Sequence, residues 1–115
     1  MDRIVERFFA AMQAGEAGPI VELFADDGVY VEPFSGRVVE HVGREAVRAA
    51  FAAQVAHPLP EQRIEVDRVD VEGDTVTARW TCHSPALPGG RGCGVNVYRV
   101  HGGRITRLET RLEGP

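Results

Sequence analysis

The stretch that decides the fold is Phe24-Ala25-Asp26-Asp27-Gly28-Val29-Tyr30-Val31-Glu32-Pro33-Phe34. It predicts an acidic turn followed by a short strand, whose alternation puts Tyr30, Glu32 and Phe34 on one face. A carboxylate that shares a face with two aromatic rings is partly shielded from water, which makes it a better proton acceptor. Two interpretations follow. Glu32 is either a general base, or an edge-strand glutamate that points at water.

Length and composition predict one globular domain over residues 1–115, with the apolar and charged shares of an ordinary soluble protein. The net charge is -4 and the arginines are scattered, so we expect binding to neither nucleic acid nor an anionic membrane. We also expect no signal peptide and no membrane span, because no long apolar run is present. Cys82 and Cys93 are too few for a disulfide framework, which favours a cytoplasmic protein with free thiols.

Three helices are predicted before residue 60. The first runs from an Asp2 cap to about Ala14, with apolar residues at three- and four-residue spacing and Gly15 as its stop signal. A short second helix begins near Pro19, and a third runs from Arg44 to about Ala56. Residues 35–43 contain two glycines and several polar residues, including Glu40 and His41, and are predicted to form a loop. Pro33 lacks an N–H, so the strand before it is either an edge strand or is about to turn away.

The second half of the chain is predicted to be all strand. Apolar parity switches between residues 64–66 and 69–71, which indicates a β-bulge near Arg68. Further strands are predicted over residues 75–83, 93–100 and 105–112. Three helices, an early short strand and a four-stranded meander predict an α+β fold. A strongly bent antiparallel sheet around helices forms a cone, which encloses an internal pocket.

Three motifs stand out along the chain, namely Glu22–Gly28, Gly43–Arg48 and Tyr98–Ile105. With the order of the predicted elements, they resemble the nuclear transport factor 2-like superfamily, in its SnoaL-like or ketosteroid-isomerase-like branch, over nearly the whole chain. These motifs are specific for the fold but poor guides to function, because the superfamily includes isomerases, dehydratases, cyclases, epoxide hydrolases and non-enzymes. The resemblance also implies a homodimer through the sheet, which Glu109 and Arg111 would face.

Ketosteroid isomerases use an Asp directly before a Pro on the first strand as general base, and Glu32 falls at that place. Asn96 falls where that family has a protonated Asp that donates to the substrate oxygen. Its amide is expected to donate at any pH. The family's oxyanion tyrosine and its two supporting tyrosines are all replaced by phenylalanine. The three aligned positions are Phe8, Phe24 and Phe51.

These residues predict a cofactor-free isomerase, cyclase or lyase that abstracts a proton from a small, largely apolar carbonyl compound. His41, in the predicted loop, is expected to be a second acid/base at the cavity mouth, or else a solvated histidine. A fast steroid isomerase is not expected, because losing one oxyanion donor costs about 100- to 1000-fold in rate. The alternative is a non-catalytic binding module for an apolar molecule. Epoxide-hydrolase chemistry with Glu32 and Arg79 is a weaker third hypothesis.

The cavity wall is predicted to be apolar, with Trp80 and Tyr98 as its preferred residues. Trp80 needs a partner for its N–H if it is buried. Cys82 is expected to share a face with Asn96, and Cys93 to lie on the opposite face. The four histidines show no ligand spacing, so no metal site is predicted. The full substrate-binding prediction is Phe8, Met12, Phe24, Tyr30, Phe34, Phe51, Val55, Ala78, Trp80, Cys82, Tyr98 and Leu108.

Overall fold

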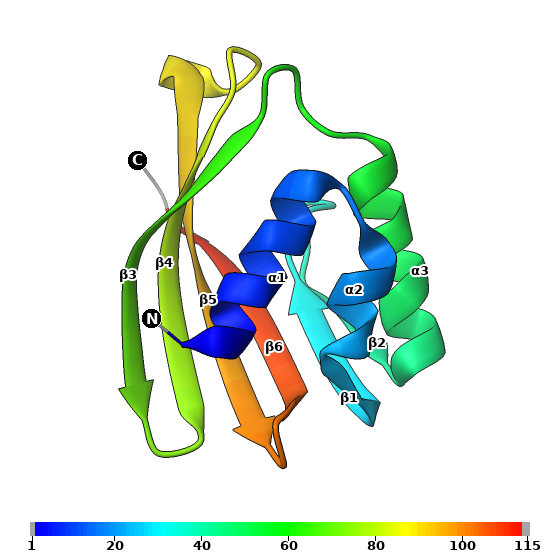
Figure 1. The fold of residues 1–115 in the computed structure, drawn as a ribbon. Coiled ribbons are helices and arrows are strands. Elements are labelled where there is room, and N and C mark those ends of the chain that lie inside the picture. The colour runs from blue at the N-terminus through cyan, green and yellow to red at the C-terminus, as the bar shows by residue number, and fades with distance from the viewer. Residues whose placement is uncertain (1, 114–115) are drawn as a thin grey trace.

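The structure, a computed structural model, describes residues 2–113 and shows three α-helices packed against one sheet (Figure 1). The helices are α1 (Arg3–Ala14), α2 (Ala17–Glu22) and α3 (Arg44–Ala56). The strands are β1 (Phe24–Glu32), β2 (Val39–Val42), β3 (Arg63–Glu72), β4 (Thr75–His83), β5 (Arg91–His101) and β6 (Arg104–Glu113). A short 3-10 helix, η1 (Pro88–Gly90), lies in the β4–β5 connection. The predicted α+β class is confirmed.

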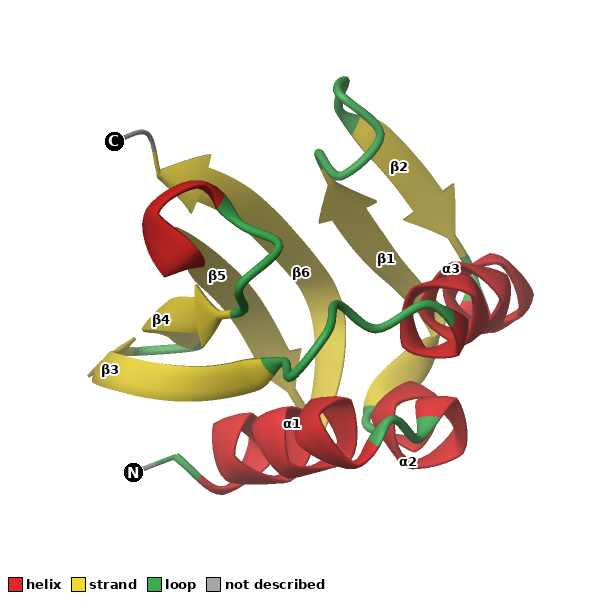
Figure 2. Ribbon diagram, turned by 90° about the horizontal axis from the view of Figure 1, so that it is seen from above, coloured by secondary structure: helices red, strands yellow, loops and turns green. Residues whose placement is uncertain are grey.

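The six strands form one sheet in the order β2-β1-β6-β5-β4-β3. Neighbouring strands are antiparallel except for β1 and β6, which run parallel. Figure 2 shows the sheet curling so that the three helices lie on its concave side. The register of β3 against β4 shifts between Val66 and Arg68, as the parity switch predicted. Such a bulge bends and twists a strand, which helps the sheet to wrap around the helices.

The ends of α1 follow from local chemistry. Asp2 Oδ1 accepts hydrogen bonds from the backbone N–H groups of Ile4 at 2.9 Å and Val5 at 3.2 Å, which satisfies two donors of the first turn. Gly15 ends the helix with φ 72°, a left-handed conformation that favours glycine. Both predicted signals are confirmed. Asp2 thus fixes where α1 begins and Gly15 where it stops, and Gly15 itself lines the cavity described below.

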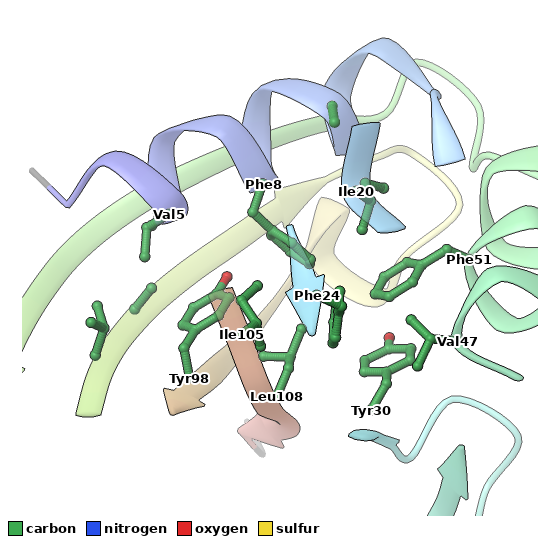
Figure 3. Packing of buried hydrophobic residues seen from close by; sticks show 13 residues of the cluster. Val5, Phe8, Ile20, Phe24, Tyr30, Val47, Phe51, Tyr98, Ile105 and Leu108 are labelled. Atoms are coloured by element: carbon green, nitrogen blue, oxygen red, sulfur yellow. The ribbon is translucent and has the colours of Figure 1, made fainter. Parts of the chain in front are cut away.

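The hydrophobic core joins the helices to the concave face of the sheet (Figure 3). Phe8 of α1 packs edge to face against Phe51 of α3 and against Tyr98 of β5, with ring centroids 5.8 Å and 5.5 Å apart. Such pairs contribute about 0.5–1.5 kcal/mol each beyond the area they bury. These contacts hold α1 and α3 at fixed positions over the sheet.

The prediction of a loop over residues 35–43 is wrong for its second half. Residues 39–42 form β2, which pairs antiparallel with β1 and places His41 opposite Tyr30. The two valines of this strand are three residues apart and fall on opposite faces, so the segment shows no alternation and its stability comes from pairing with β1. As a result β1 is not an edge strand. Pro33 follows its last residue, where the chain turns away.

The prediction for Asp26–Gly28 also needs correction. These residues lie within β1, in the irregular part of its pairing with β6 between Phe24 and Val29, rather than in a turn before the strand. A Cβ on Gly28 would lie 3.1 Å from the carbonyl oxygen of Ile105, so a larger residue would crowd the neighbouring strand. The acidic residues therefore sit on a bulged strand that stays in the sheet.

Candidate active site

A cavity of about 940 Å³ lies at the end of the molecule where α1 and α3 terminate. Its wall is largely apolar and comes from both helices, the segment after α3, and the concave face of the sheet. A second hollow of about 740 Å³ between α1 and α2 is more open, and its lining includes Arg7, Arg44 and Arg104. The larger cavity has the enclosure and mixed lining of a small-molecule site.

Glu32 and His41 form a hydrogen-bonded pair beside this cavity. Glu32 Oε2 lies 2.9 Å from His41 Nε2, and Glu32 Oε1 accepts the backbone N–H of Phe34 at 2.8 Å. The Glu32 side chain is only 12% exposed. Neither residue belongs to the cavity lining itself, but Tyr30 and Phe34, on either side of Glu32 along the chain, do. The carboxylate is thus sheltered at the cavity's margin rather than directed into bulk water.

Tyr30 carries a hydroxyl into the cavity wall. Its ring stacks on Phe51 of α3, with centroids 4.3 Å apart, and on His41 of β2 at 5.8 Å. Gln54 Nε2 donates to the Tyr30 hydroxyl oxygen at 2.6 Å. Burial raises the pKa of Tyr30 far above that of a free tyrosine. Tyr30 is therefore a neutral phenol that stacks with two rings and whose hydroxyl oxygen accepts a hydrogen bond from an amide.

Asn96 is the centre of a buried polar network on the cavity wall. Its Oδ1 accepts from Trp80 Nε1 at 3.0 Å and from Thr110 Oγ1 at 2.8 Å, and its Nδ2 donates to the Tyr98 hydroxyl at 3.0 Å. An indole N–H can only donate, so the amide atom facing Trp80 must be the oxygen. The amide's orientation is therefore fixed. The predicted need of Trp80 for a partner is met by Asn96.

The predicted wall residues divide into two groups. Those that line the cavity are Phe8, Met12, Tyr30, Phe34, Val55, Trp80 and Cys82, together with Asn96. Those that lie off its wall, in the hydrophobic core, are Phe24, Phe51, Ala78, Tyr98 and Leu108. All five core residues are fully buried, because the helices pack directly on this part of the sheet. Tyr98, a preferred wall residue, instead supports Asn96 from behind.

Gln54 and Thr110 are two of the polar wall residues that sequence reasoning missed. A signal existed for each. Gln54 lies three residues after Phe51 on α3, and residues at that spacing share a helix face. Thr110 lies two residues after Leu108 on β6, and residues at that spacing share a strand face. Both were passed over because polar residues on predicted amphipathic elements are normally solvent-facing.

Other candidates lie away from the cavity or have partners elsewhere. Arg79 donates to Glu113 at 2.7 Å, which removes the second member of the Glu32–Arg79 hypothesis from the concave face. Cys82 lines the cavity, whereas Cys93 pairs in register with Thr81 and faces the opposite side, as alternation predicted. Burial raises the pKa of Cys82, so its thiol is a weak nucleophile.

Within residues 2–113, no group of three or more histidine, cysteine, aspartate or glutamate side chains has the arrangement of a metal site. The helices of that part of the chain are all too short or too polar to cross a membrane. His83 lies 3.2 Å from Glu65 on the neighbouring strand, a partly exposed pair.

Residues 5–108 match the family of the SnoaL-like domain. No curated protein gives a significant match. Among solved structures, the chain is similar to a protein described as a candidate polyketide cyclase from Sinorhizobium meliloti, with 25% identity and a TM-score of 0.78. That alignment covers 96% of this chain and 95% of the other.

Two further solved structures have the same fold. An NTF2-like protein of unknown function from Mesorhizobium loti is 27% identical, with a TM-score of 0.77 and coverage of 96% of this chain and 88% of that one. A protein from Catenulispora acidiphila with a ketosteroid isomerase-like fold, solved with trimethylamine, is 23% identical. Its TM-score is 0.79, with coverage of 96% and 85%. These similarities establish the fold and leave the chemistry to the site.

Proposed function

The chain belongs to the SnoaL-like branch of the nuclear transport factor 2-like superfamily, and within that branch we propose that it is a cofactor-free isomerase, cyclase or lyase. Its substrate is a small, largely apolar carbonyl compound, from which Glu32 removes a proton next to the carbonyl. The observation that carries the proposal is the sheltered Glu32–His41 pair at the margin of a 940 Å³ cavity.

Glu32 is the proton acceptor in this mechanism. Its two oxygens each accept one hydrogen bond, from Phe34 N and from His41 Nε2, and each keeps a second lone pair. The proton passes from the substrate carbon to the carboxylate, and the C–H electron pair moves into the enolate. Return of the proton to another carbon gives isomerisation, whereas attack or elimination by the enolate gives a cyclase or lyase. His41 orients the carboxylate and is placed to relay the proton.

The substrate oxygen needs a donor as its negative charge develops. Asn96 supports this role because it is neutral, lines the cavity and has a fixed orientation. Both lone pairs of its Oδ1 are used by Trp80 and Thr110, and such donation polarises an amide and strengthens its N–H groups as donors. A fixed neutral donor stabilises an oxyanion without reorganising during the reaction.

Isomerisation of a small β,γ-unsaturated ketone tests this proposal, because conjugation of the product can be followed by absorbance. We expect turnover by the unmodified chain and a loss of about 100- to 10,000-fold in Glu32→Gln, the usual contribution of a general base. Glu40→Gln is the matched control, because Glu40 lies on β2 next to His41 but is exposed. Equal rates in Glu32→Gln and the unmodified chain would remove Glu32 from the mechanism.

A second candidate function is non-catalytic binding of an apolar molecule in the same cavity. It is favoured by phenylalanine at the three positions where ketosteroid isomerases have tyrosine, one of which, Phe8, lines the cavity. On this alternative, apolar ligands raise the melting temperature equally in the unmodified chain and in Glu32→Gln, and neither protein turns over a ketone.

The proposal extends to location and assembly. Free thiols at Cys82 and Cys93 suit the reducing cytoplasm, and a net charge of -4 gives no attraction to nucleic acid or an anionic membrane. A homodimer through the outer face of the sheet is proposed as well. On that face Arg111 donates to Glu109 at 2.7 Å, which lowers the pKa of Glu109. Sedimentation equilibrium at two concentrations distinguishes a dimer from a monomer.

A further inference from the structure

The cavity lacks a hydroxyl at Phe8, but it has one on a different element. We propose that the Tyr30 hydroxyl is a second donor to the reacting oxygen of the substrate, and that Gln54 is the positioning residue that aims it. The inference deepens the proposed function and rests on it for the identity of the ligand, a carbonyl compound. It gives Tyr30 of β1 and Gln54 of α3 the oxyanion-donor role that Phe8, which has no hydroxyl, cannot fill.

Ring stacking holds the Tyr30 side chain in a fixed position. The Tyr30 ring is fixed on one side by Phe51, at 4.3 Å and an interplanar angle of 17°, and stacks with His41 at 5.8 Å and 26°. Tyr30 is 2% exposed, yet it belongs to the cavity lining, as does Gln54. A ring held by stacking cannot swing away when a ligand enters. Its hydroxyl therefore has the preorganised position that oxyanion stabilisation requires.

The Tyr30 hydroxyl has a proton available for a hydrogen bond to a ligand. Gln54 Nε2 donates to Tyr30, so the phenol oxygen is an acceptor in that bond and its own proton is free for another partner. Thr110 is the other polar neighbour of this hydroxyl, and its own proton is already donated to Asn96 Oδ1 at 2.8 Å. A carbonyl oxygen that gains negative charge is a stronger acceptor than a neutral threonine hydroxyl. Tyr30 can thus turn its proton toward a bound oxyanion.

The proposed donor and base lie on one strand. Tyr30 and Glu32 are alternate residues of β1 and share its concave face, about 7 Å apart along the backbone. Because both belong to the same strand, their separation does not depend on any domain or loop movement. Burial raises the pKa of Tyr30, so the group stays a neutral donor.

The test measures the bond at the carbonyl itself. Acetylnaphthalene labelled with ¹³C at the carbonyl is bound to the full chain in the Glu32→Gln background, where no turnover is needed, and its C=O stretch is recorded by difference infrared spectroscopy. We expect a shift to lower frequency than in an apolar solvent. Tyr30→Phe should move the stretch back toward the solvent value and weaken binding about 2- to 10-fold.

Gln54 is tested by two substitutions of similar shape. Gln54→Met removes the donor and should broaden the stretch, because the Tyr30 hydroxyl is no longer aimed. Gln54→Glu keeps the shape but presents a carboxylate, which only accepts, so Tyr30 should donate to it instead and the shift should be lost. A role limited to packing predicts the same stretch in both. These two variants keep the proposal testable if Tyr30→Phe does not fold. Glu40→Gln, on the exposed side of β2 and outside the cavity lining, should retain the shift.

The outcomes separate this inference from the proposed function. A shifted stretch that is lost in Tyr30→Phe and in Gln54→Glu supports the donor role, even if no ketone is turned over. An unchanged stretch in both variants overturns the inference, even if Glu32-dependent turnover is present. The absence of any shift in the saturated parent protein, with saturation followed by Trp80 fluorescence, overturns it as well.

Discussion

The indole ring of Trp80 occupies the space that a side chain at Gly94 would need. The two residues are directly opposite on β4 and β5, and a Cβ built on Gly94 would lie 2.7 Å from Trp80 Cε2. This close approach lets the ring lie against the strand and bring its Nε1 within 3.0 Å of Asn96 Oδ1. The glycine is therefore part of what orients the amide on the cavity wall.

Gly94→Ala should destabilise the protein by about 1–3 kcal/mol, the usual cost of overpacking, because the ring has to leave its place. Gly92→Ala is the control. A Cβ there would meet only Leu87 Cδ1 at 3.7 Å, an ordinary contact, although Gly92 lies on the same strand and also lines the cavity. Urea denaturation measures both. Equal stability of the two variants would show that the contact between Trp80 and Gly94 places no demand on the residue.

Trp80→Phe removes the indole N–H while keeping an aromatic ring against β5. Asn96 Oδ1 then keeps only the bond from Thr110, and we expect the free energy of unfolding to fall by about 1–3 kcal/mol. Far-UV circular dichroism during urea titration measures the change. A stability equal to that of the parent would mean that the indole bond contributes nothing.

Trp80 is the only tryptophan in the chain and lies on the cavity wall, so its emission reports what enters the cavity. An apolar ketone should change the intensity and wavelength of emission in a saturable way, because it replaces water next to the ring. A small, strongly charged molecule of similar size should leave the emission unchanged. Saturable changes with the charged molecule alone would contradict an apolar binding site.

Alkaline pH should destabilise the fold. Burial raises the pKa of both tyrosines, so the folded state holds two protons that the unfolded state releases above about pH 10. Stability must then fall as pH rises, by about 2.7 kcal/mol per pH unit when both are ionised in the unfolded chain. The chain has no lysine, which leaves this pH range nearly free of other groups.

Urea denaturation at several pH values from about 9 to 11 measures that slope. Tyr98→Phe should reduce it by half, because one of the two protons is no longer released. The raised pKa of Cys82 adds a contribution at lower pH that is common to both proteins, so the comparison isolates the tyrosine. A flat profile, or an unchanged slope in Tyr98→Phe, would contradict the burial of the phenols.

The sequence predicted much of the fold because its signals are local. The Asp2 cap, the Gly15 stop, the extent of α3 and the bulge near Arg68 depend on residues close to one another in the chain. The strand β2 was missed because its two valines, Val39 and Val42, fall on opposite faces and give no alternation, so that its order depends on pairing with β1. Which residues line the cavity also depends on how far each helix lies from the sheet, and no local pattern records that distance.

In the candidate site, too, features set by neighbouring residues were predicted and features set by tertiary packing were not. Strand alternation placed Glu32 on the face of Tyr30, but its partner His41 was assigned to a loop, so the hydrogen bond between them was not foreseen. Tyr98 was expected on the cavity wall and lies behind it, where it accepts a hydrogen bond from Asn96. Gln54 came from a helix whose polar residues normally face water. Partners that are distant in sequence are set by tertiary packing, which a linear pattern does not contain.

The most direct test of the central claim is exchange of the methyl protons of acetylnaphthalene in D₂O, followed by proton NMR. Exchange requires only removal and return of a proton next to the carbonyl, so it does not depend on the natural substrate. The account predicts acceleration by the unmodified chain and by Glu40→Gln, and a rate lower by about 100- to 10,000-fold in Glu32→Gln. Exchange that is equally fast with and without the Glu32 carboxylate would contradict it.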